Sequence, residues 1–124
     1  MQSNSPPKLL IIDDEKEYCS LMEDFFSEEG FSVEMANSGV EGLSKVETFQ
    51  PDVILLDKKM PMMGGVECLK RISAITSSPV IIVSGALDIK GRDECLDLGA
   101  YAFITKPINL DEVLGKVNSA LKKE

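Results

Sequence analysis

The chain contains no histidine, and this absence removes several classes of catalytic and metal-binding site. Ser-His-Asp and Cys-His nucleophiles, histidine-ligated metals and a phosphohistidine on this polypeptide are all excluded. A nucleophile or general base must therefore be an aspartate, glutamate, lysine, serine, threonine, tyrosine or cysteine. The motif GxxxxGK[ST] is also missing, and no GxGxxG follows the first apolar run, so no nucleotide-binding loop of either kind is expected.

Other absences limit the compartment and the partners. No apolar run approaches the roughly 20 residues that span a bilayer, and the N-terminus has neither the basic nor the apolar region of a signal peptide. With 13 basic and 21 acidic side chains, the net charge of −8 disfavours direct contact with nucleic acid or anionic membranes. We therefore expect a cytoplasmic protein in which three widely spaced cysteines stay reduced and pack in helices: Cys19, Cys68 and Cys95.

The composition predicts one soluble globular domain. Hydrophobic residues make up 44% of the chain and charged residues 27%, a balance typical of a folded domain. No linker, internal repeat or low-complexity segment marks a second unit. We expect residues 1–7 to be a disordered lead-in and residues 8–124 to form the domain. The sequence fits both a complete single-domain protein and one piece of a longer protein, and both alternatives stay open.

Short apolar runs alternate five times with amphipathic stretches that have helical spacing. The expected strands cover residues 8–12, 31–35, 52–56, 79–83 and 101–104. This βα repeat predicts a flavodoxin-like α/β fold, in which a doubly wound, five-stranded parallel sheet forms the middle of a three-layer sandwich. Residues 31–35 alternate between polar and apolar and indicate an edge strand, which fits the strand order 2-1-3-4-5.

Local signals mark the ends of the expected helices. Ser38 and Asn109 can cap helix starts, and Gly30 and Gly99 stand where the glycines that end helices are found. The fourth helix, about residues 88–98, has the weakest pattern because it is polar and Gly91 interrupts it. We expect this segment to be mobile.

Polar residues follow four of the five expected strands. Asp13-Asp14 comes after the first strand, Asp57 after the third, Ser84-Gly85 after the fourth and Lys106-Pro107 after the fifth. The carboxyl ends of parallel strands meet at one edge of the sheet, and ligands bind there at the switch point, which in this order lies between strands 1 and 3. We therefore expect three carboxylates, one hydroxyl and one amine in one pocket.

Each of these groups also has an ordinary structural explanation when it is taken alone. Two aspartates after a strand can cap the next helix, and Ser-Gly or Lys-Pro can be a plain turn. Their convergence from four strand ends favours a functional site. Crowded carboxylates repel one another, and an all-oxygen site of this kind suits Mg²⁺. Such a site, beside an amine and a hydroxyl, would bind phosphate oxygens, with Asp57 as the nucleophile that accepts a phosphoryl group.

The chain resembles the receiver domains of two-component response regulators from about Lys8 to its end. The motifs that carry the resemblance are Asp13-Asp14, Asp57 followed by Lys-Lys-Met-Pro and Gly64-Gly65, Ser84-Gly85, and Lys106-Pro107. The resemblance implies that Asp57 is the phosphoacceptor, with Ser84 and Lys106 each bonding a phosphoryl oxygen.

The resemblance also implies a cofactor and a switch. Mg²⁺ would be held by Asp57, by Asp14 directly, by Asp13 through a water and by the backbone carbonyl of Lys59. Phe103 falls three residues before the lysine, where the family carries its switch aromatic. It lacks a tyrosine's hydroxyl, and Ser84 replaces the commoner threonine. We also expect the Lys59 side chain to affect the rate of dephosphorylation.

The implied function is a signalling switch in a phosphorelay. A histidine kinase or phosphotransfer protein would donate the phosphoryl group, and slow hydrolysis would remove it. The protein would thus catalyse its own phosphorylation and dephosphorylation without being a conventional enzyme. The face made by the fourth helix, the fifth strand and the last helix would then contact an output protein or effector domain, as a monomer or as a phosphorylation-dependent homodimer.

Three other functions compete with this interpretation. A pseudo-receiver would use the same fold as a phosphorylation-independent interaction module, but the full set of polar residues argues against it. A haloacid dehalogenase-type enzyme would want a second aspartate at the position of Lys59. A flavodoxin-like FMN protein would want a Ser/Thr/Gly-rich phosphate loop after the first strand, where this chain has Asp13-Asp14-Glu15.

Overall fold

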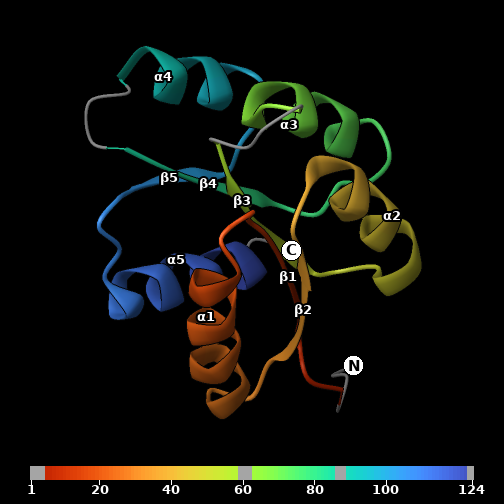
Figure 1. Ribbon diagram of the computed structural model, residues 1–124, viewed down its shortest axis with the longest axis vertical. Helices are drawn as coiled ribbons and strands as arrows, with labels where there is room; N and C mark the ends of the chain where they lie inside the picture. The colour runs from red at the N-terminus through yellow and green to blue at the C-terminus, as the bar shows by residue number, and fades with distance from the viewer. Residues whose placement is uncertain (1–4, 59–62, 86–88, 123–124) are drawn as a thin grey trace.

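A computed structural model describes residues 5–58, 63–85 and 89–122, in which strands and helices alternate (Figure 1). The predicted lead-in, residues 1–7, lies partly outside these ranges. None of the described helices is both long and apolar enough to cross a membrane. The elements are β1 (Lys8–Ile12), α1 (Lys16–Glu28), β2 (Ser32–Ala36), α2 (Gly39–Phe49), β3 (Val53–Asp57), α3 (Gly65–Ser73), β4 (Val80–Ser84), α4 (Ile89–Asp97), β5 (Ala102–Thr105) and α5 (Leu110–Lys122).

The five strands form one parallel sheet in the order β2-β1-β3-β4-β5, which confirms the predicted flavodoxin-like fold. Helices α1 and α5 cover one face, and α2, α3 and α4 cover the other (Figure 1). Strands β1, β3 and β4 are completely or almost completely buried, because helices cover both of their faces, and their sequences are correspondingly apolar throughout. The more polar β2 is an edge strand, as predicted.

Alternate residues of each strand contribute to two separate hydrophobic cores. The core under α1 and α5 contains strand residues Leu9, Ile11, Val53, Leu55, Ile81 and Val83. The core under α2, α3 and α4 contains Leu10, Ile12, Ile54, Leu56, Val80 and Ile82. The three cysteines are buried in helices and form no disulfide, as predicted.

Four strands begin and end one residue later than expected, and this shift moves two site residues into the sheet. Pro79 has no backbone N–H to donate, and β4 begins at the following residue, Val80. At the other end of β3, the backbone N–H of Lys58 donates to the carbonyl of Val83 at 3.0 Å, so the ladder continues past Asp57. Asp57 and Ser84 are therefore the last residues of their strands rather than loop residues.

The predicted helix ends are confirmed. The Ser38 hydroxyl accepts from the N–H of Glu41 at 3.1 Å, and the Asn109 side chain accepts from the N–H of Glu112 at 3.0 Å. Gly30 and Gly99 both have positive φ. Helix α4 runs through Gly91, which is buried, so the glycine does not break the helix. The expected mobility of this segment stays a prediction.

Candidate acidic site at the carboxyl edge of the sheet

Three carboxylates meet at the carboxyl ends of β1 and β3. Asp13 follows β1, Asp57 ends β3, and these two strands are hydrogen-bonded neighbours. Asp13 and Asp57 are only 3% and 4% exposed, whereas Asp14 is exposed. One carboxylate oxygen from each aspartate lies within 4.8 Å of the other two. The expected cluster of three carboxylates is thus present in the structure.

Four hydrogen bonds fix Asp13. Its N–H donates to the carbonyl of Ala36 at 2.9 Å, and its side chain accepts from the N–H of Glu15 at 2.9 Å. Its carbonyl accepts from the Asn37 side-chain amide at 3.0 Å and from the Cys19 thiol at 3.4 Å. The sequence analysis missed Asn37. The signal that pointed to the aspartates, a polar residue directly after a strand, also applies to Asn37, which follows β2.

Lys58, directly after Asp57, lies against Gly65 at the start of α3. The N–H of Gly65 donates to the carbonyl of Lys58 at 2.8 Å. A Cβ atom on Gly65 would lie 2.5 Å from the Cα of Lys58, so only glycine allows this approach. The glycine thereby determines where the chain runs immediately after Asp57. Lys59, named above as a possible metal ligand and modulator, lies outside the described residues.

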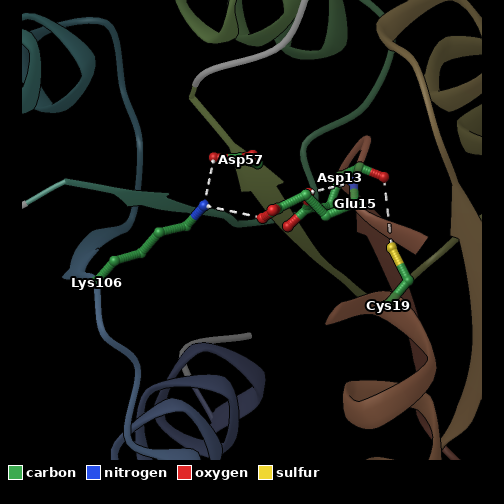
Figure 2. A network of polar contacts seen from close by, with 5 residues as sticks. All are labelled: Asp13, Glu15, Cys19, Asp57 and Lys106. Atoms are coloured by element: carbon green, nitrogen blue, oxygen red, sulfur yellow. Dashed lines mark hydrogen bonds and ion pairs between the residues drawn. The ribbon is translucent and has the colours of Figure 1, made fainter. Parts of the chain in front are cut away.

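Lys106 reaches the carboxylates from the end of β5. Its Nζ atom lies 3.4 Å from Oδ1 of Asp57 and 3.9 Å from Oε1 of Glu15 (Figure 2). The same nitrogen lies 5.4 Å from the centre of the Tyr18 ring, within the range of a cation–π contact. The sequence predicted the lysine at this edge but did not identify its contacts with Glu15 and Tyr18, because both precede or lie in α1 rather than follow another strand.

Ser84 lies in β4, the strand next to that of Asp57, and Phe103 lies in β5, one strand further along the sheet. Ser84 ends β4, between β3 and β5, and is 2% exposed. Its carbonyl accepts from the N–H of Lys106 at 2.7 Å. Phe103, in β5, is half-buried and packs against the core under α2, α3 and α4. Most of the predicted site residues within the described ranges therefore lie at the carboxyl ends of the strands, whereas Phe103 lies inside β5.

Burial and charge together determine the protonation of these groups. Burial, aided by the nearby Asp57 carboxylate, raises the pKa of Asp13 to about 6, against the opposing effect of the Glu15 N–H. For Lys106, burial lowers the pKa, but the carboxylates of Asp57 and Asp13 outweigh it and the net shift is upward. The lysine therefore stays protonated, and one ammonium faces a cluster of three carboxylates.

The donor set fits a hard divalent cation. All three groups are carboxylates, the ligands that Mg²⁺ and Ca²⁺ prefer. One oxygen from each carboxylate lies within 4.8 Å of the other two, close enough for the three groups to share one cation. The raised pKa of Asp13 shows that its charge is poorly solvated where it lies, and a cation would relieve this cost.

Comparison with known proteins identifies the family. The family model described as the response regulator receiver domain matches residues 9–118. The chain belongs to this family. Among solved structures, this receiver domain superposes with a TM-score of 0.91 on a CheY-like receiver domain from Methanospirillum hungatei, which is 31% identical, with 96% of each chain covered. It also matches a CheX–CheY–BeF3–Mg complex from Borrelia burgdorferi with a TM-score of 0.86 and 32% identity, covering 93% of this chain and 89% of that one.

Curated relatives are longer than this receiver domain. A protein-glutamate methylesterase/protein-glutamine glutaminase of Bacillus subtilis is 41% identical over 113 residues, which cover 84% of this chain and 31% of that protein. The CpxR homolog of Haemophilus influenzae, a transcriptional regulatory protein, is 35% identical over 117 residues, covering 94% of this chain and 51% of that protein. The receiver domain therefore aligns with about a third of one relative and about half of the other, and the two relatives carry different activities in their names.

Proposed function

We propose that the protein is a phosphorylatable signalling switch in which Asp57 accepts a phosphoryl group from a histidine kinase or phosphotransfer protein. This proposal rests on the charged groups that surround Asp57. Its buried carboxylate lies 3.4 Å from a protonated lysine and within 4.8 Å of the Asp13 and Asp14 carboxylates. The group that would act as nucleophile, the cation that would pair with phosphoryl oxygens and the carboxylates that would bind a metal thus lie close together.

The transfer converts the phosphorus–nitrogen (phosphoramidate) linkage of a phosphohistidine into an acyl phosphate on Asp57. An oxygen of Asp57 attacks phosphorus, and the bond from phosphorus to the donor's imidazole nitrogen breaks, releasing a neutral imidazole after proton uptake. Lys106 pairs with a phosphoryl oxygen as charge builds on it, and the Ser84 hydroxyl donates to another. Hydrolysis reverses the modification when water attacks phosphorus and the Asp57 carboxylate leaves.

Asp13, Asp14 and Asp57 would hold Mg²⁺, together with the backbone carbonyl of Lys59. When bound, Mg²⁺ would neutralise charge on the transferring phosphoryl group and on the carboxylates around it. The matched Borrelia burgdorferi complex contains Mg²⁺ and BeF3, and this supports the assignment. The protein's own contribution is to hold Asp13 through its bonds to Asn37, Cys19 and Ala36, so that the carboxylates are in place before the cation binds.

The signal would pass through the face made by α4, β5 and α5. Ser84 in β4 would move toward a phosphoryl oxygen, and Phe103 in the neighbouring β5 would fill the space that it leaves. The modification shifts a population between two states only to the extent that it interacts differently with them. The changed face would then bind an output protein, an effector domain or a second copy of the chain.

Intact-mass measurement tests the proposal. The protein is incubated with acetyl phosphate, with Mg²⁺ or with EDTA, beside Asp57→Asn and a control in which an exposed aspartate of α1 is changed, Asp24→Asn. We expect a single phosphoryl adduct on the wild type and on Asp24→Asn, only with Mg²⁺, and none on Asp57→Asn. An absence of adduct at every Mg²⁺ concentration would contradict the proposal and favour a pseudo-receiver.

A further inference from the structure

The side chain of Glu15 points away from the helix that it precedes. Glu15 occupies the N-cap of α1, where a side chain commonly accepts from the first N–H groups of the helix, but it makes no such bond. Its carboxylate instead approaches the Lys106 ammonium, at 3.9 Å (Figure 2). The backbone of Glu15 is held beside the site because its N–H donates to Asp13. The backbone of Glu15 is thus anchored to Asp13, and its carboxylate lies within ion-pair distance of Lys106.

Tyr18 supports the same position of the lysine. It lies three residues after Glu15, on the same side of α1, and its ring faces the Lys106 ammonium at 5.4 Å. The lysine side chain is only 28% exposed. One ammonium is therefore shared between a buried carboxylate at 3.4 Å and a largely exposed one at 3.9 Å.

We propose that Glu15 is a positioning residue that competes with the phosphoryl group for Lys106 and so slows the capture of phosphodonors. This inference rests on the proposed function of Asp57. A single ammonium has one positive charge, and each anion that it pairs with weakens its attraction for the next. The Glu15 carboxylate also adds negative charge at the mouth of the site, which repels an approaching phosphate. Both effects act in the same direction.

The size of the effect follows from the exposure of Glu15. Its side chain is 66% exposed, and exposed ion pairs contribute little energy because water and salt screen them. We therefore expect Glu15→Gln to raise the rate constant for phosphorylation by acetyl phosphate about two- to fivefold. The gain should shrink toward no change in about 1 M salt, where the screening length is roughly 3 Å.

The experiment measures the rate of adduct formation by intact mass at saturating Mg²⁺, verified by doubling the Mg²⁺ concentration. Glu17→Gln removes an equal charge from an exposed residue of the same helix turn, and we expect it to change the rate less than Glu15→Gln. Glu15→Asp keeps the charge, and we expect it to stay within about twofold of the wild type. A structural role for the side chain would not produce this dependence on charge and salt.

A second measurement observes Lys106 without any phosphoryl group. NMR signals of the Lys106 side chain should move in Glu15→Gln and stay in place in Glu17→Gln. Equal phosphorylation rates in Glu15→Gln and the wild type, or unmoved Lys106 signals, would overturn this inference and leave the proposed function of Asp57 intact. If the wild type forms no adduct, the proposed function fails and this inference fails with it.

Discussion

The ammonium of Lys106 and the carboxylate of Asp57 are 3.4 Å apart, although their strands, β5 and β3, are not neighbours. Strand β4 lies between them, and the lysine backbone is bonded to its last residue, since the Lys106 N–H donates to the carbonyl of Ser84 at 2.7 Å. The side chain therefore spans one strand to reach its partner. This arrangement places a fixed positive charge beside the carboxylates that would hold a metal.

Lys106→Met should increase the affinity for Mg²⁺. The ammonium repels a divalent cation bound to the same carboxylates, and methionine keeps a similar length without the charge. We expect Mg²⁺ to bind about three- to tenfold more tightly, as judged from Coulomb energies of charges a few ångströms apart near a solvated surface. Isothermal titration calorimetry at constant pH and ionic strength measures the change.

Lys16→Met is the matched control for this prediction. Lys16 is exposed at the start of α1, so its removal changes the net charge equally without altering the site. We expect the control to change the affinity less than twofold, because exposed charges are screened. Equal affinities for Mg²⁺ in Lys106→Met and the wild type would show that the lysine charge does not affect metal binding.

Asp13 should make the metal-free protein less stable as the pH rises. Its pKa is raised from 3.8 to about 6 in the folded state, so folding favours the protonated form. The resulting contribution to the free energy of unfolding is full below about pH 4 and is lost as the pH rises through about 6. Its size is about 3 kcal/mol, from the difference between the two pKa values. Urea unfolding in EDTA across this range measures the loss.

Asp13→Asn isolates this contribution from those of the other carboxylates. The asparagine side-chain oxygen can still accept from the Glu15 N–H, but it carries no charge to bury. We expect Asp13→Asn to be more stable than the wild type at pH 7.5 in EDTA, by up to about 3 kcal/mol, and to lose most of the stabilisation that Mg²⁺ gives. Asp14→Asn, at an exposed position, should gain much less. A wild type as stable as Asp13→Asn in EDTA would contradict the burial cost.

The sequence predicted the fold and the aspartates because both follow from simple periodicity. Apolar runs buried on both faces end where polar residues begin, and parallel strands bring those ends together. The bonds that orient these groups were harder to predict. Asn37 contacts a backbone carbonyl of Asp13, and Glu15 contacts Lys106 across 91 residues of sequence. Such contacts depend on side-chain rotamers and loop conformations, and the hydrophobic periodicity of the sequence does not determine these.

Gly42 and Gly115 should respond oppositely to replacement by alanine. A Cβ atom on Gly42 would lie 2.6 Å from the Cδ1 of Ile12, which is fully buried in the core. We expect Gly42→Ala to lower the free energy of unfolding by about 1–2 kcal/mol, since overpacking exceeds the gain in helix propensity. Gly115 is exposed in α5 with no atom within 4 Å of the added Cβ, so Gly115→Ala should add about 0.5–1 kcal/mol. Urea unfolding of both variants checks the signs, and a stabilising Gly42→Ala would show that the α2–β1 contact is loose.

Gly65 and Gly64 are adjacent, but only position 64 has room for a side chain. Serine at 65 would bring its Cβ within 2.5 Å of the Lys58 Cα, a backbone atom that cannot rotate away. Serine at 64 would meet no atom within 4 Å, and position 64 is the N-cap of α3, where serine is favourable. We expect Gly65→Ser to lower stability by about 1–3 kcal/mol and Gly64→Ser to leave it unchanged or slightly raised.

The same pair of variants tests whether the contact between Lys58 and Gly65 sets the geometry of the site. Lys58 is bonded on one side to Val83 and on the other to Gly65, so displacing it would also displace Asp57. Gly65→Ser should therefore weaken Mg²⁺ binding and slow adduct formation with acetyl phosphate at least several-fold, measured where both variants are fully folded. Gly64→Ser should match the wild type in both measurements. If Gly65→Ser loses stability but binds Mg²⁺ and forms the adduct normally, the Lys58–Gly65 contact supports the fold without positioning Asp57, because a displaced carboxylate could not preserve both reactions.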